Sequence, residues 1–138
     1  MVELNKVNLL IVLCVTVPTD HFENIKDVLI NGTTAFHCRY SPGANVVWYY
    51  QQYCDNFEHG LYSCSSQTAI TAGNQYQIRT DSPGEHSLLI SSVTKSMTGL
   101  YTCENRQSRA MISSMFLNVV CKYNFLLLLL VIYRRVSS

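Results

Sequence analysis

Charge is scarce in this sequence. Charged side chains make up 14% of the 138 residues, and the formal net charge is +1. A protein that binds nucleic acid needs a basic stripe to neutralise phosphates, and this composition provides none. We therefore expect no nucleic-acid partner.

Motifs for catalysis and cofactor binding are also absent from the sequence. No Cys-x-x-Cys pair or phosphate-cradling loop occurs, and His37, His59 and His86 stand in no recognisable nucleophile motif. The sequence therefore predicts no enzyme, no metal and no cofactor. Binding is the class of function that remains.

A long helical stripe is missing as well. Between about residues 20 and 120 the chain consists of short alternating segments separated by turn residues, which is the profile of an all-β sandwich or barrel. A chain of 138 residues is long enough for one domain and too short for two.

An apolar segment opens the chain. Lys6 precedes an apolar run at 9–17, and the small residue Thr19 follows, which is the order of a secretory signal. We predict a signal peptide at 1–19, with a buried N-terminal strand as the alternative. Removal of the signal would also remove Cys14 and leave five cysteines, enough for two bridges and one further thiol.

A second apolar segment closes the chain. An unbroken apolar run at 125–132 is followed by Tyr133 and two arginines, the order of a type I membrane anchor, although a span usually needs about 20 residues. We predict a short stalk and marginal transmembrane segment at 120–133 and a cytoplasmic tail at 134–138. Lys122 would either snorkel to the interface or contact an acidic transmembrane adaptor. The alternative is a tail that does not hold the protein in the membrane.

Alternation in the central region places two cysteines and a tryptophan on inward faces. Cys38, Trp48 and Cys103 each point inward on a separate predicted strand. In an oxidising compartment this arrangement predicts a buried Cys38–Cys103 bridge packed against the indole. The expected core comprises Trp48, Tyr101, Leu88 and Ile90.

Four landmarks carry a resemblance to a known family: Cys38, Trp48, the segment SLLISSV at 87–93, and the run of Gly99, Tyr101 and Cys103. Together they resemble the B, C, E and F strands of an immunoglobulin V-set domain over roughly 25–120. The resemblance implies a β-sandwich of two antiparallel sheets, here placed at 20–119. It also implies that Tyr101 is a tyrosine corner, whose hydroxyl bonds to backbone upstream.

Two features depart from that family's usual pattern. Met97 stands where an Asp usually pairs with an arginine such as Arg79, so we expect that ion pair to be missing, at a cost of about 1 kcal/mol at most. The last strand, AMISSMFLNVV, has no Phe-Gly-x-Gly. A rearranged antigen-receptor chain is therefore not expected.

Three cysteines remain beyond the central pair. Parity and an oxidising compartment favour a local Cys54–Cys64 bridge, and an extra bridge in this region resembles the V domains of myeloid and polymeric-immunoglobulin receptors. Cys121 lies past the last strand. It would form either an interchain bridge of a homodimer or an unpaired thiol.

The first candidate binding surface is an outward sheet face. Alternation places Tyr49, Gln51, Thr102 and Glu104 outward on two predicted strands. In V-set families, a Tyr directly after the Trp and a Gln two residues further lie on the face that pairs domains. Tyrosine also buries area with little loss of side-chain entropy. An ordinary solvated sheet face is the alternative.

The second candidate surface is the loop NRQSRA. Arg106 and Arg109 stand among polar residues there, and arginines suit an acidic partner such as a carboxylate or a sialylated glycan. Solvated arginines are the alternative. Separately, Asn31, Gly32 and Thr33 form a glycosylation sequon at a predicted turn.

These observations predict an immune-type receptor or accessory subunit of the cell surface that binds a protein or glycan ligand. We expect a glycoprotein of the secretory pathway that crosses the plasma membrane once. The short tail holds no tyrosine-based motif, so a signal would need an adaptor. Two alternatives stay open: a soluble secreted decoy or truncated receptor form, and an adhesion or accessory subunit of a membrane complex.

Overall fold

The computed structural model describes residues 24–56, 60–121 and 133–134. The elements of this part, in chain order, are β1 Ile25–Leu29, β2 Thr34–Arg39, β3 Val46–Asn56, β4 Gly60–Ser63, β5 Thr68–Ala69, β6 Tyr76–Ser82, β7 Glu85–Ile90, the 3-10 helix η1 Lys95–Met97, β8 Gly99–Asn105 and β9 Met111–Val120. The predicted signal peptide, Cys14, His59, Lys122 and the apolar run at 125–132 lie outside the described residues.

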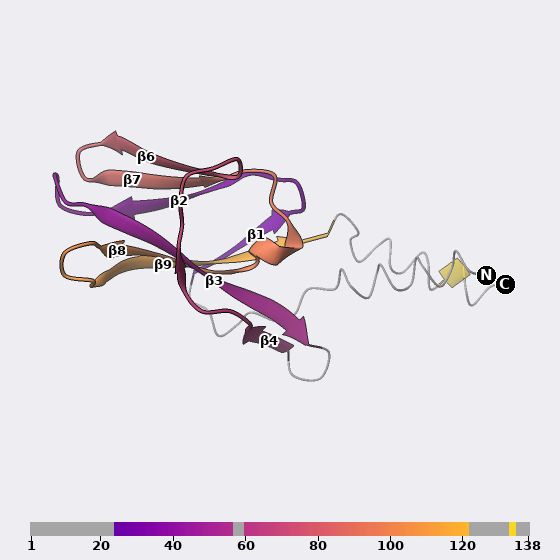
Figure 1. The fold of residues 1–138 in the computed structure, drawn as a ribbon. Helices are drawn as coiled ribbons and strands as arrows, with labels where there is room; N and C mark the ends of the chain where they lie inside the picture. The colour runs from indigo at the N-terminus through magenta and orange to yellow at the C-terminus, as the bar shows by residue number, and fades with distance from the viewer. Residues whose placement is uncertain (1–23, 57–59, 122–132, 135–138) are drawn as a thin grey trace.

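The strands form two facing sheets (Figure 1). The larger sheet has the order β1-β9-β8-β3-β4, with β5 also paired to β3, and the smaller sheet has the order β2-β7-β6. The predicted all-β immunoglobulin sandwich is therefore confirmed. One detail was wrong, because β1 pairs with β9 in parallel. The chain leaves β1 for the opposite sheet, so no hairpin forces the two strands to run antiparallel.

The core lies between the inner faces of the two sheets. A disulfide joins Cys38 to Cys103 across 65 residues, with the Cα atoms 6.5 Å apart. Trp48 lies directly opposite Cys103 in the β3–β8 pair, and its ring packs edge-on against Phe36, with 5.1 Å between the ring centroids. Leu88, like Trp48, is fully buried. The bridge, the indole and their inward placement thus agree with the strand alternation.

The ends of two elements differ from the prediction. β3 continues through Cys54 to Asn56, where a turn was expected, because residues 53–56 pair with β4. The expected polar turn after β7 contains η1, whose carbonyl groups accept hydrogen bonds described below. Both segments are rich in polar residues, but backbone pairing decides their conformation.

Candidate binding surfaces

Three tyrosines tie β8 to the rest of the domain. The Tyr101 hydroxyl donates to the carbonyl oxygen of Met97 at 2.9 Å, as the tyrosine-corner resemblance implied. The Tyr76 and Tyr101 hydroxyl oxygens are 3.2 Å apart, and the Tyr50 hydroxyl donates to the Ser96 carbonyl. Burial raises the pKa of Tyr101 and of Tyr50 well above the usual range, because the phenolate would lose its hydration. The strands that carry both candidate surfaces are therefore fixed to one another.

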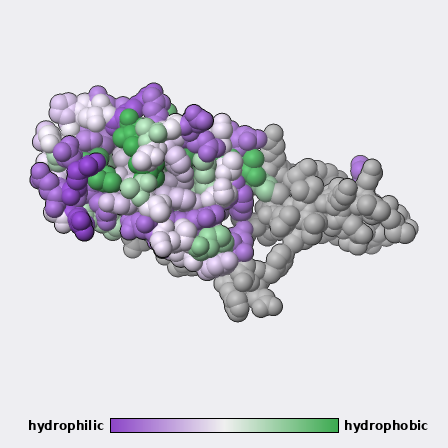
Figure 2. Space-filling view, viewed as in Figure 1, coloured by the Kyte–Doolittle hydropathy of each residue, from purple (hydrophilic) through white to green (hydrophobic). Residues whose placement is uncertain are grey.

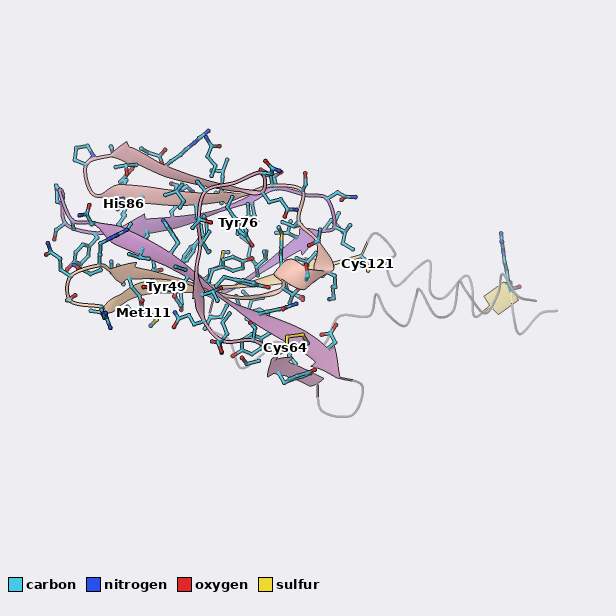
Figure 3. All side chains as sticks on the ribbon, in the orientation of Figure 1. Tyr49, Cys64, Tyr76, His86, Met111 and Cys121 are labelled. Atoms are coloured by element: carbon cyan, nitrogen blue, oxygen red, sulfur yellow. A yellow bond between two sulfur atoms is a disulfide. The ribbon has the colours of Figure 1, made fainter. Side chains whose placement is uncertain are left out.

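A second disulfide fixes the edge of the larger sheet. It joins Cys54 of β3 to Cys64, just after β4, with the Cα atoms 5.8 Å apart (Figure 3). The Cys64 backbone N–H also donates to the Gln52 carbonyl at 3.0 Å. The segment between β4 and β5 is thereby held against β3.

Cys121 follows β9 and is also disulfide-bonded. The other four cysteines of the described residues pair with one another. The alternative of an unpaired thiol is therefore wrong. An interchain bridge at this position stays a prediction.

The outward face of β3 and β8 is partly covered by the chain itself. The Gln51 side-chain amide donates to the Ser63 hydroxyl at 2.6 Å. The Gln67 amide reaches across β3 and donates to the Thr102 hydroxyl at 3.1 Å. Thr102 faces outward as expected but is buried, while Tyr49 is half-buried. Alternation predicts the direction of a side chain, and it cannot show what covers that side chain.

The turn between β8 and β9, which we call the F–G turn (residues 105–110), is organised by one side chain. The Asn105 carboxamide oxygen accepts the backbone N–H groups of Gln107 and Ser108 at 2.8 and 3.2 Å. The Asn105 backbone N–H donates to Ala110, and its carbonyl accepts from Arg109 at 2.8 Å. Asn105 is 9% exposed. Most backbone groups of the turn are thus satisfied internally, which holds it in one conformation.

Two exposed arginines stand on this ordered turn. Arg106 and Arg109 form no ion pair with any residue in the described part of the chain. Arg109 has a φ of 58°, a left-handed conformation that glycine or asparagine adopts at lower cost than arginine. Met111, at the start of β9, is 62% exposed. Figure 2 shows hydrophilic residues gathered at the end of the sandwich where this turn lies.

Sequence reasoning missed a polar network on the outward face of the smaller sheet. The Ser87 hydroxyl donates to Asp81 at a donor–acceptor distance of 2.5 Å, and it also contacts His37 Nδ1 at 2.9 Å. Arg39 pairs with Glu85 beside it at 3.1 Å. A pocket of about 270 Å³ is bordered by four of them: His37, Arg39, Asp81 and Glu85. A bulge between β6 and β7 brings Asp81 to Ser87, and no sequence pattern signals that contact.

The residues that the structure covers show neither a metal-binding cluster nor a membrane-spanning helix. Those residues contain no group of three or more His, Cys, Asp or Glu side chains placed to hold a metal ion. Among the same residues, no helix has the length and apolar character needed to cross a membrane. Arg79 forms no ion pair in this part of the chain, as the presence of Met97 implied.

The comparisons with known proteins give a family and a structural likeness. Residues 27–120 match the immunoglobulin V-set domain family. A search of curated protein sequences found no match. Among solved structures, the chain is similar to the ZIG-8–RIG-5 IG1–IG1 heterodimer in its monoclinic crystal form. The identity is 17%, the TM-score is 0.48, and the match covers 72% of this chain and 84% of that one.

Proposed function

Because this chain belongs to the immunoglobulin V-set family, we propose that it is a cell-surface recognition protein that binds a protein or glycan ligand through this domain. Members of the family are typically non-enzymatic recognition modules of extracellular or secretory-pathway proteins. Fold alone does not choose the ligand. The choice has to come from the surface that the domain presents.

One observation supports the F–G turn as the contact surface. It is rigid, it is exposed, and it carries Arg106 and Arg109 without carboxylate partners in the described chain. A preorganised loop loses little conformational entropy when it binds. Arginine prefers carboxylate and other oxyanion partners, so the proposed ligand presents an acidic group. The Tyr49 face is less suited, because Gln51 and Thr102 already bond within the chain.

Two charge-reversal variants, one on the F–G turn and one on β6, test this proposal. We would display the full tagged chain on animal cells, or collect it from their medium and multimerise it through its tag. Binding to a panel of other cells would then be measured. Arg106→Glu should lower binding at least tenfold. Arg79→Glu is the matched control, because Arg79 is also exposed, has no ion pair among the described residues and lies on β6. It should change binding less than twofold. If Tyr49→Ala abolishes binding and Arg106→Glu does not, the ligand contacts the outward face of β3 and β8 instead of the F–G turn.

The domain boundaries belong to the same proposal. We assign a signal peptide to 1–19, the V-set domain to 20–119, a stalk and anchor to 120–133 and a cytoplasmic tail to 134–138. The tagged chain should then stay in carbonate-washed membranes and stain at the cell surface. Lys122→Leu should abolish capture of an acidic adaptor. Release of the chain into the medium would instead favour the secreted alternative.

A further inference from the structure

A shallow groove separates the two sheets along one side of the domain. Its walls are β1, the edge strand of the larger sheet, and β2, the edge strand of the smaller sheet, and its volume is about 730 Å³. The side chains of Val28, Leu29, Ala35 and Leu89 supply most of its apolar lining. The groove is thus an apolar surface at the open seam of the sandwich.

The groove is open to solvent although its lining is apolar. Leu29 is 54% exposed. The Lys26 ammonium reaches across and donates to the Ala35 carbonyl at 3.3 Å, while the Asp27 carboxylate accepts from the Asn118 side-chain amide at 3.0 Å. A ligand with both an apolar face and hydroxyl or amide groups would match this combination.

The turn that closes one end of the groove carries the glycosylation sequon. The Gly32 N–H donates to the Leu29 carbonyl at 2.8 Å, and Asn31 has a φ of 69°. A positive φ at the third position is the feature of a type II turn, which favours glycine or asparagine there. The Asn31 residue is exposed, and the two residues that follow it, Gly32 and Thr33, line the groove. A group attached to Asn31 would therefore start at the groove's rim.

We propose that Asn31 carries an N-linked glycan and that its first N-acetylglucosamine unit lies in this groove. The step needs a lipid diphosphate oligosaccharide as donor. The Asn31 side-chain nitrogen bonds to the anomeric carbon of that donor and loses a proton, while the sugar's bond to the diphosphate breaks and the lipid diphosphate leaves. The ring and the acetyl methyl group of this sugar then cover Leu29 and Ala35. The Lys26 side chain hydrogen-bonds the sugar hydroxyl and amide oxygens. This inference rests on the secretory route proposed above.

Enzymatic trimming tests the contact with Leu29 and Ala35 left in place. The full tagged chain would be collected from the surface or medium of animal cells, so that every molecule tested has passed through the secretory pathway. One portion would be trimmed to a single sugar, and another would have the whole glycan removed by amide hydrolysis, which leaves Asp at position 31. We expect the single-sugar form to keep the Tm of the untrimmed form, and the glycan-free form to lose about 3–6 °C. Equal Tm values in all three forms, or no glycan at Asn31 by mass spectrometry, would overturn the proposal.

Two serine variants, at Leu29 and Ile78, distinguish a glycan contact in the groove from a general stabilising effect of the glycan. Leu29→Ser removes apolar lining at a largely exposed position, so we expect the domain to fold and the glycan's contribution to Tm to disappear. Ile78→Ser is the control, because Ile78 is 42% exposed on β6 and does not line the groove. The glycan should stabilise that variant as it does the wild type. A glycan contribution that persists unchanged in Leu29→Ser would overturn the proposal.

Discussion

Tyr101 joins the two sheets through the contact of its hydroxyl with that of Tyr76. Its ring lies 4.8 Å from the Tyr50 ring of β3 and 6.4 Å from the Tyr76 ring of β6, measured between centroids. It is fully buried, and its hydroxyl takes part in bonds with both Met97 and Tyr76. A buried hydroxyl with two partners is costly to remove, because its partners would be left unpaired.

Tyr101→Phe is therefore expected to lower the free energy of unfolding by about 1–2 kcal/mol. Tyr49→Phe is the matched control, because the Tyr49 hydroxyl makes no hydrogen bond with any residue that the structure describes. That variant should stay within about 0.5 kcal/mol of wild type. Urea denaturation followed by tryptophan fluorescence measures both values, and equal losses in the two variants would contradict the role given to Tyr101.

Alkaline pH provides a second prediction about the same residue. The pKa of Tyr101 is raised in the folded protein, whereas an unfolded chain ionises its tyrosines near about pH 10. Above that pH the unfolded state binds fewer protons than the folded state, so stability falls as pH rises, by about 1.4 kcal/mol per pH unit for this group. Tyr101→Phe should lose stability less steeply than wild type between about pH 10 and 11. If the free energy of unfolding falls equally steeply with pH in both proteins, the prediction for Tyr101 is wrong.

At the scale of the elements, the F–G turn depends on Asn105. Its side chain accepts two backbone N–H groups, and its position at the end of β8 aligns the turn with β9. The sequence predicted the turn and its arginines, but it gave no signal that Asn105 organises them. The role of Asn105 follows from the strand register, which places this residue at the end of the β3–β8 and β8–β9 pairing.

Asn105→Ala should lower the free energy of unfolding by about 1–2 kcal/mol and speed amide hydrogen exchange at residues 107 and 108. Asn105→Asp is the control, because its carboxylate keeps an acceptor oxygen at the same place. Exchange in that variant should stay close to wild type. If both variants exchange equally fast, another interaction must order the turn.

The inward and outward residues of the strands were predictable, but contacts across strands were not. Period-two alternation placed Cys38, Trp48 and Cys103 correctly because burial imposes one face on each strand. The Gln67–Thr102 bond joins residues 35 apart in sequence. Its existence depends on how the edge segment folds over β3, and local sequence does not encode that path.

At the scale of the whole molecule, the proposed binding end and the chain exit lie apart. β9 begins at Met111 beside the F–G turn and ends at Val120, before Cys121 (Figure 1). Ten extended residues span about 33 Å. An anchor following Cys121 would therefore leave the F–G turn facing away from the membrane. That geometry suits recognition of a ligand on another cell.

Binding by the Arg109→Gly variant tests this account most directly. Glycine relieves the positive φ of residue 109, so the variant should match or exceed the wild-type Tm while it loses the guanidinium group. The account predicts that binding to partner cells falls at least fivefold with the fold intact. Unchanged binding by a normally folded Arg109→Gly variant would contradict recognition through the F–G turn.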